Sequence, residues 1–229
     1  MHKCGKEWHL SMKYNVVLWD FDGTLVDTSE GIFHSLRIAF ARMGMPIPEI
    51  ETLEQFIGPP MLYSFQTFLG YSLEQAEQGV QLFRQDYETK GIYKSHVYDG
   101  IEKLLMQLRE QGVKIGVATL KPERMAKLLL KHFGIDTLVD ICVGTGEDEN
   151  SNTSKAGIIE SILQTLDCRD KSRVVLVGDT IYDATGAKDT GIDFIAAAYG
   201  FGIDEERDKH HSIGIAHNTE EIYKILQGQ

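Results

Sequence analysis

Short apolar runs alternate with amphipathic stretches along most of this chain of 229 residues. The apolar runs have the length of buried strands and are too short to span a membrane. Strands that alternate with helices predict βαβ units, and therefore a parallel sheet covered by helices on both faces. The predicted strands are Tyr14–Trp19, Lys114–Thr119, Leu138–Val143, Arg173–Val177 and Asp193–Ala197, and the predicted helices are Gly100–Gln111, Glu123–Phe133, Ser154–Leu166 and Tyr182–Thr190.

Residues 29–95 interrupt this alternation because they contain no convincing strand. Ser29–Met43 and Leu73–Lys90 have helical periodicity, and Gly58-Pro59-Pro60 marks a turn or the start of a helix. A helical insert directly after the first strand would lie above the C-terminal edge of the sheet, as a lid would. We therefore predict a core of residues 1–28 and 96–229, with 1–12 as a polar extension, and a helical cap domain at 29–95.

The charge balance restricts the classes of partner. The formal net charge is −11 at pH 7, which argues against nucleic-acid binding and against an anionic membrane surface. A site for an anionic substrate would need local cations or a metal ion to offset this field. The three cysteines form no CxxC pair, and the N-terminus has no apolar run. We expect a cytoplasmic protein with reduced thiols, either a monomer or a homodimer.

Polar side chains with chemical potential follow four of the predicted strands. They are Asp20 and Asp22 after the first strand, Thr119 at the end of the second, Lys155 at the start of the helix after the third, and Asp179 and Asp183 after the fourth. In a parallel sheet all of these positions lie at one edge, where ligands bind. The pattern thus predicts that residues far apart in the sequence meet in one small volume.

This set of side chains suits phosphoryl transfer. Close carboxylates repel each other unless a cation lies among them, and Mg²⁺ is the usual ion where phosphate is also a ligand. An aspartate can attack phosphorus, and a second carboxyl group two residues later, in an extended segment, points to the same side and can move protons. The lysine and the threonine would bind the phosphoryl oxygens, and Gly23 would let the backbone approach them. The alternative is that the aspartates are turn residues that cap helices.

The segment DFDGTLVDT, Asp20–Thr28, resembles the first motif, DxDGT, of the haloacid dehalogenase superfamily of phosphohydrolases. Thr119 in VATLKP is similar to the second motif, Lys155 to the third, and GDTIYD at Gly178–Asp183 to the GDxxxD form of the fourth. The resemblance covers the chain from Tyr14 onward. It implies an α/β fold with a Rossmann-like parallel sheet core, and an inserted all-helical cap between the first and second motifs.

The resemblance also implies a role for each matching residue. Asp20 would be the nucleophile and a magnesium ligand. Asp22 would be the general acid and base, and would ligate the metal through its backbone carbonyl. Thr119 and Lys155 would bind the phosphoryl group. Asp179 would ligate the metal directly, whereas Asp183 would hold a metal-bound water or Lys155.

Three further segments are candidates for substrate binding. Lys121 competes with Lys155 and would contact either phosphate or the cap. Leu120 stands where many relatives have serine or asparagine, so a contact there would come from its backbone. Gly58 and Pro59 are part of a segment similar to FxGPP of relatives named phosphoglycolate phosphatases or nucleotidases, where it lies near the substrate pocket; a plain turn is the alternative.

The acidic residue at position 22 narrows the reaction. Relatives that cleave carbon–halogen or phosphorus–carbon bonds have no acid there, so Asp22 indicates a phosphate ester. The mutase subgroup resembles this chain at Thr28 but has a histidine where this chain has Ile32, which favours hydrolysis. We expect a Mg²⁺-dependent phosphomonoester hydrolase for a small phosphorylated metabolite, 2-phosphoglycolate or a nucleoside monophosphate. A β-phosphoglucomutase-type mutase and a non-catalytic regulator that binds a phosphometabolite are the alternatives.

Overall fold

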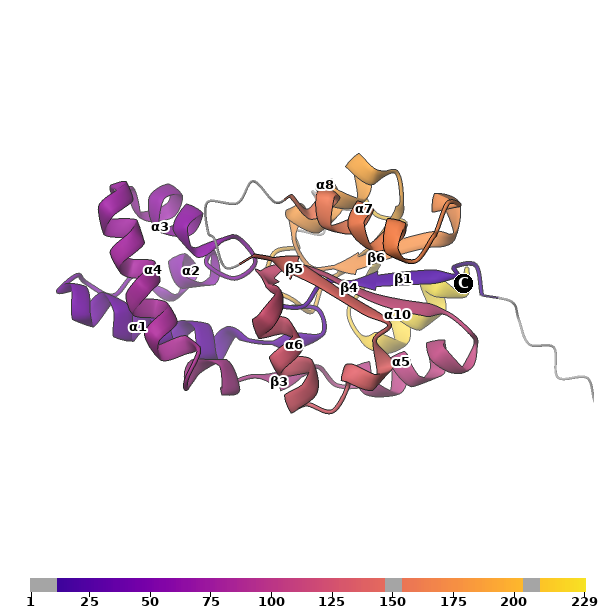
Figure 1. The fold of residues 1–229 in the computed structure, drawn as a ribbon, viewed down its shortest axis with the longest axis horizontal. Coiled ribbons are helices and arrows are strands. Elements are labelled where there is room, and N and C mark those ends of the chain that lie inside the picture. Colours follow the sequence, from indigo (N-terminus) through magenta and orange to yellow (C-terminus); the bar gives the residue numbers. More distant parts are fainter. Residues whose placement is uncertain (1–11, 147–153, 204–210) are drawn as a thin grey trace, which may run out of the picture.

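A parallel sheet forms the centre of the molecule in the computed structural model, which describes residues 12–146, 154–203 and 211–229 (Figure 1). Its strand order is β5-β4-β1-β6-β7-β8, and every pair is parallel. The strands are β1 (Val16–Trp19), β4 (Lys114–Pro122), β5 (Ile141–Thr145), β6 (Val174–Gly178), β7 (Asp193–Ala197) and β8 (Gly214–Ala216). The predicted parallel α/β fold is confirmed. The expected extension at 1–12 falls, apart from Met12, outside the described residues.

Helices cover both faces of this sheet (Figure 1). One face carries α7 (Lys155–Thr165) and α8 (Ile181–Thr190), and the other carries α5 (Ile101–Glu110), α6 (Glu123–His132) and α10 (Thr219–Leu226). Strand β1 supplies apolar side chains to both faces, because alternate residues point to opposite sides. Val16 and Leu18 pack in one core cluster, whereas Val17 and Trp19 pack in the other. A strand buried on both sides must be apolar throughout, which explains its continuous apolar run.

Four helices lie beyond the C-terminal ends of the parallel strands (Figure 1). They are α1 (Ser29–Met43), α2 (Ile50–Glu54), α3 (Met61–Leu69) and α4 (Leu73–Tyr87), and we call them the helical unit. Two short antiparallel strands, β2 (Val26–Asp27) and β3 (His96–Val97), stand where the chain leaves and re-enters the core. Inside the unit, the rings of Phe40, Phe56 and Phe65 meet edge to face at centroid distances of 5.2–6.5 Å. Such pairs stabilise a small core beyond the burial of their area.

Some predicted boundaries are wrong. The third strand was expected to start at Leu138, but Asp136–Leu138 forms a 3₁₀ turn, η2, and β5 starts at Ile141. Leu138 and Val139 are apolar because they pack against the core from this turn, and not because they pair in the sheet. The helix expected over Leu73–Lys90 ends at Tyr87. Helix α3 starts directly after Gly58-Pro59-Pro60, where a turn or a helix start was expected. Three short elements were not predicted, namely α2, β8 and α10.

Candidate active site

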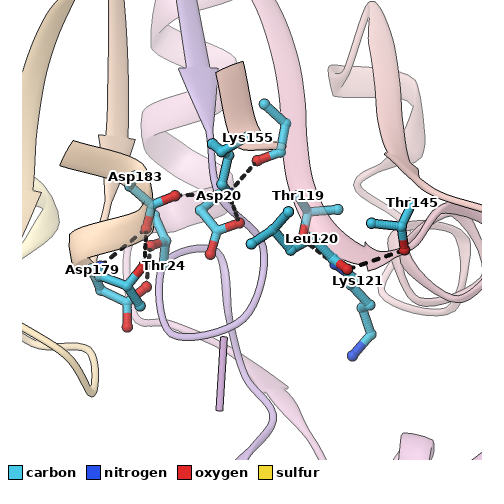
Figure 2. Close-up of polar contacts among 11 residues, drawn as sticks. Asp20, Thr24, Thr119, Leu120, Lys121, Thr145, Lys155, Asp179 and Asp183 are labelled. Carbon is cyan, nitrogen blue, oxygen red and sulfur yellow. Dashed lines mark hydrogen bonds and ion pairs between the residues drawn. The ribbon is translucent and has the colours of Figure 1, made fainter. Parts of the chain in front are cut away.

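The residues after β1 continue the sheet for one step and then turn sharply. The backbone N–H of Asp20 donates to the carbonyl of Val177, so pairing with β6 extends to this aspartate. The carbonyl of Phe21 then accepts from the N–H groups of Leu25 and Val26, which closes a tight loop. This loop directs Asp20 toward the centre of the C-terminal edge of the sheet (Figure 2).

Lys155 connects Asp20 to Asp183. It is the first residue of α7, whose N-terminus is capped by Ser154. Its Nζ lies 2.6 Å from Oδ1 of Asp20 and 2.7 Å from Oδ1 of Asp183, and it donates to the carbonyl of Ala118 at 2.7 Å (Figure 2). Burial lowers the pKa of Lys155, but the carboxylates of Asp183 and Asp20 outweigh it and raise the pKa above its usual range. The lysine is therefore a permanent cation beneath the carboxylates.

Three buried carboxylates, two of them paired with this lysine, lie close together. Oxygens of Asp20, Asp179 and Asp183 lie within 4.8 Å of one another. Burial raises the pKa of Asp20 to about 7 even though Lys155 opposes the shift, and burial also raises the pKa of Asp179 well above its usual range. One lysine thus does not neutralise the cluster. A divalent cation with oxygen ligands would, and the all-carboxylate donor set fits Mg²⁺.

Neighbouring groups fix the carboxylates of Asp179 and Asp183. Asp179 accepts from Oγ1 of Thr24 at 3.0 Å and from the backbone N–H of Phe201 at 2.9 Å. Asp183 accepts at Oδ2 from both the backbone N–H and the hydroxyl of Thr180, at 3.0 and 2.6 Å, in a capping box that starts α8. Its Oδ1 therefore remains for Lys155. Such outer contacts hold ligand oxygens in place before a metal binds.

Two glycines of the motifs make this close packing possible. Gly23 has a φ of +83°, and a Cβ atom there would lie 2.1 Å from Oδ2 of Asp179. A Cβ at Gly178 would lie 2.4 Å from Cγ of Asp183. Any side chain at either position would displace a carboxylate. The motif glycines are thus required by the geometry of the aspartates.

Asp22 lies apart from the three clustered carboxylates. Its Oδ1 accepts from the hydroxyl of Thr28 at 2.7 Å and from Nζ of Lys121 at 2.9 Å. The two aspartates of the first motif thus have separate cations, Lys155 for Asp20 and Lys121 for Asp22. The metal contact expected from the backbone carbonyl of Asp22 stays a prediction.

Thr119, Leu120 and Lys121 form the last part of β4. The hydroxyl oxygen of Thr119 accepts from the backbone N–H of Lys121 at 3.1 Å, so the hydroxyl proton remains for another acceptor. The carbonyl of Leu120 accepts from the hydroxyl of Thr145 at 3.1 Å (Figure 2). Figure 2 also shows the side chain of Lys121 extending away from Asp20, whereas Lys155 points to it. The two candidate lysines therefore do not compete for one position.

A cavity of about 80 Å³ lies between the helical unit and the sheet edge. From the core, it is lined by Asp22, Leu120, Lys121 and Pro122, among others. From the helical unit, it is lined by Ile32, Phe56, Gly58, Pro59, Pro60, Met61, Phe83, Arg84 and Tyr87. The structure thus brings Gly58 and Pro59 to the same cavity as Asp22. Gly58 has a φ of +103°, and a Cβ there would lie 3.2 Å from Cγ2 of Thr180.

Sequence reasoning missed two groups of site residues. Thr24 and Thr28 lie in the quoted first motif, and their small hydroxyl side chains beside the aspartates were a usable signal. Tyr87 belongs to the helical unit, and its hydroxyl lies 2.8 Å from Nζ of Lys121. No motif marks this tyrosine, because its contact depends on how α4 packs over the core.

Comparison with known proteins identifies relatives that match most of the chain. The family model described as haloacid dehalogenase-like hydrolase matches residues 17–197. A 5'-nucleotidase of Pseudomonas aeruginosa is 32% identical over 217 residues, which are 95% of this chain and 97% of that protein. Tyrosine-protein kinase PtkA of Mycobacterium tuberculosis is 36% identical over 203 residues, 88% of this chain and 68% of that one. More distant relatives are named pyrophosphatase and phosphoglycolate phosphatase.

Solved structures agree with these relatives. A protein described as a predicted phosphatase from Clostridium acetobutylicum superimposes with a TM-score of 0.87 at 31% identity, over 94% of this chain and 99% of that one. In the part of the chain that the structure describes, no helix is both long and apolar enough to cross a membrane.

Proposed function

Because the chain belongs to the haloacid dehalogenase-like hydrolases and is a phosphatase, we propose that it hydrolyses phosphomonoesters with Asp20 as nucleophile and Mg²⁺ as cofactor. The observation that carries this proposal is the separation of Asp20 from Asp22. Asp20 lies in a carboxylate cluster with Lys155, whereas Asp22 lies at the cavity with Lys121. Adjacent carboxylates with separate cations suit one nucleophile and one proton carrier.

In the proposed reaction Asp20 forms the bond to phosphorus and Asp22 moves the protons. A carboxylate oxygen of Asp20 attacks phosphorus, the bond from phosphorus to the leaving oxygen breaks, and Asp22 gives that oxygen a proton. In the second step Asp22 takes a proton from water as the water attacks phosphorus, which releases inorganic phosphate and restores Asp20. Lys155 orients Asp20, and the free hydroxyl proton of Thr119 binds a phosphoryl oxygen.

The three clustered carboxylates fit a magnesium ion. Asp20 and Asp179 would bind it directly, and Asp183 would act through Lys155 and through water. When bound, Mg²⁺ neutralises phosphoryl oxygens and orients the phosphate for in-line attack. Burial, together with the neighbouring carboxylates, raises the pKa values of Asp20 and Asp179, and a bound cation would favour their ionised forms.

The cavity of about 80 Å³ would have to widen to admit a metabolite, and its aromatic lining suits a flat ring. Phe56, Phe83 and Tyr87 supply aromatic faces, so a nucleoside monophosphate is the preferred substrate class. Arg84 also lines the cavity and brings a positive charge to it, which would attract the carboxylate of 2-phosphoglycolate and keeps this smaller ester as the second candidate. We propose that the helical unit acts as a cap domain that closes over the substrate and excludes water.

The mutase alternative is less well supported by the same cavity. Ile32, at the position where the mutase subgroup has a histidine, is buried and lines it. An isoleucine cannot exchange a proton with a sugar hydroxyl, so transfer to water is favoured. The non-catalytic alternative depends only on the presence of Leu120 in place of serine or asparagine. The carbonyl of Leu120 accepts a hydrogen bond from the hydroxyl of Thr145.

A panel of phosphorylated metabolites with and without Mg²⁺ tests this proposal. Release of inorganic phosphate from nucleoside monophosphates, lost with EDTA and restored by Mg²⁺, is the expected result. An isomerised sugar phosphate without free phosphate would establish the mutase instead. Since one relative is named a tyrosine-protein kinase, the panel includes ATP with a tyrosine peptide. Peptide phosphorylation without any monoester hydrolysis would contradict the proposal.

A further inference from the structure

Lys121 joins the core to the helical unit inside the site. Its Nζ lies 2.9 Å from Oδ1 of Asp22 in the core and 2.8 Å from the hydroxyl of Tyr87, the last residue of α4. All three residues are buried. A buried ammonium group needs such partners, because its desolvation is costly without them. The position of Lys121 thus depends on both parts of the molecule.

The contacts of Asp22 fix its rotation. Both of its hydrogen bonds, from Thr28 and from Lys121, go to Oδ1. Among the described residues, no partner is bonded to Oδ2, and Asp22 lines the cavity. Two donors on one oxygen hold the carboxyl plane, and they leave the other oxygen for the substrate. The oxygen that exchanges the proton is therefore placed by Thr28 and Lys121.

Tyr87 is held rigidly on its own side. Its ring stacks on Phe83, one helical turn earlier in α4, with centroids 4.9 Å apart and planes at 17°. The ammonium of Lys121 also lies 4.9 Å from the centroid of the Tyr87 ring, so the tyrosine binds it through both ring and hydroxyl. When α4 moves relative to the core, the hydroxyl of Tyr87 has to move with it.

We propose that Tyr87 is a positioning residue that places Asp22 for proton transfer, acting through Lys121, when the helical unit lies against the core. This inference rests on the proposed function. It couples closure over the substrate to the orientation of the proton carrier, so proton transfer is efficient only in the closed enzyme. It also assigns Lys121 to the acid–base residue, and not to the phosphoryl group that the sequence analysis considered for it.

The inference predicts a dependence on the leaving group. An alkyl ester such as a nucleoside 5'-monophosphate needs a proton on its leaving oxygen, whereas p-nitrophenyl phosphate releases a stable phenolate without one. Loss of the Tyr87 hydroxyl should therefore slow the first class and spare the second. A tyrosine that only stabilises the fold would affect both classes equally.

Tyr87→Phe is the main test variant, because it keeps the ring, its stacking on Phe83 and the pair between Lys121 and Asp22. Glu88→Gln is the matched control. Glu88, the next residue, pairs with Arg124 of α6 at 2.9 Å and so crosses the same boundary without contact to Asp22. The measurement is kcat/KM, with Mg²⁺ present, for a series of alkyl and aryl phosphates, since kcat/KM reports the first phosphoryl transfer.

For Tyr87→Phe, kcat/KM should fall about tenfold for alkyl esters and less than about twofold for p-nitrophenyl phosphate, part of the ~10²–10⁴-fold that positioned proton transfer contributes. Glu88→Gln should leave the ratio between the two classes at its wild-type value. An equal loss for both classes in Tyr87→Phe, or the same changed ratio in Glu88→Gln, overturns the inference while leaving the hydrolase intact. Absence of turnover in the wild-type enzyme across the series would reject the proposed function itself.

Discussion

Two buried lysines hold the two aspartates of the first motif, and their surroundings differ. Lys155 bridges Asp20 and Asp183, and all its partners belong to the core. Lys121 bridges Asp22 and Tyr87, so one of its partners comes from the helical unit. The first pair is fixed by residues of the core alone, whereas the second is complete only when the helical unit is in place. The site thus combines a static centre with a proton carrier that depends on domain position.

Asp20→Asn should have the largest effect on activity. The amide oxygen is a poor nucleophile and carries no charge, so kcat should fall by at least about 10³-fold, as for other lost nucleophiles. Lys155 keeps its pair with Asp183, so the fold should persist. Phosphate release and a thermal melt measure both effects, and a variant that retains a tenth of wild-type activity would show that Asp20 is not the nucleophile.

Lys155→Met should destabilise the protein more than Lys121→Met. The first removes the cation of two buried carboxylates, and the second removes the cation of one. Breaking a buried pair on one side typically costs about 3–5 kcal/mol. Urea denaturation of both variants without metal gives the comparison. A larger loss of unfolding free energy in Lys121→Met would reverse our ranking of the two pairs.

The stability of the metal-free protein should fall as pH rises, and the stabilising effect of Mg²⁺ should grow. Burial raises the pKa of Asp20 to about 7 and that of Asp179 also upward, so the metal-free folded protein binds more protons than the unfolded chain. Stability from both groups is present below about pH 4, their usual pKa. The contribution of Asp20 is lost as pH rises through about 7, and that of Asp179 is lost as pH rises through its own raised pKa. Mg²⁺ favours the ionised carboxylates, so its stabilising effect should grow from pH 5 to pH 8.

Melting temperatures across this pH range, with Mg²⁺ and with EDTA, measure this effect. Asp20→Asn is the control, because it removes one of the titrating groups and should weaken the trend. An effect of Mg²⁺ that is the same at pH 5 and pH 8 would show that the clustered carboxylates do not hold the ion.

Thr28→Val should have the smallest effect. The variant removes the second donor to Oδ1 of Asp22 but keeps Lys121. Loss of one such hydrogen bond typically changes the free energy by about 0.5–1.5 kcal/mol, so kcat/KM for alkyl esters should fall only a few-fold. If kcat/KM falls further than in Tyr87→Phe, the orientation of Asp22 depends mainly on Thr28 in the core. The two lysines would then differ less than we propose.

The sequence predicted the cluster of Asp20, Asp179 and Lys155 better than the contacts of Lys121. Strand ends of a parallel sheet meet at one edge, so Asp20 and Asp179 could be brought together from their positions alone. The contact between Lys121 and Tyr87 could not be predicted in this way. Tyr87 reaches the site through the packing of α4 on the core, and this packing leaves no local pattern in the sequence. The third strand was misplaced because Leu138 packs in the core from a turn, and apolar residues look alike in both settings.

The central claim is that the phosphoryl group is transferred first to Asp20 and then to water. The most direct test is a rapid acid quench of Asp22→Asn with radiolabelled p-nitrophenyl phosphate and Mg²⁺. This ester needs no proton on its leaving oxygen, and the variant lacks the base for the second step, so the intermediate should accumulate. Borohydride reduction followed by peptide mass spectrometry locates the acyl phosphate. We predict one modified residue, Asp20, with none in Asp20→Asn. Label on another residue, or phosphate release by the wild-type enzyme with no covalent phosphate in any variant, would contradict the account.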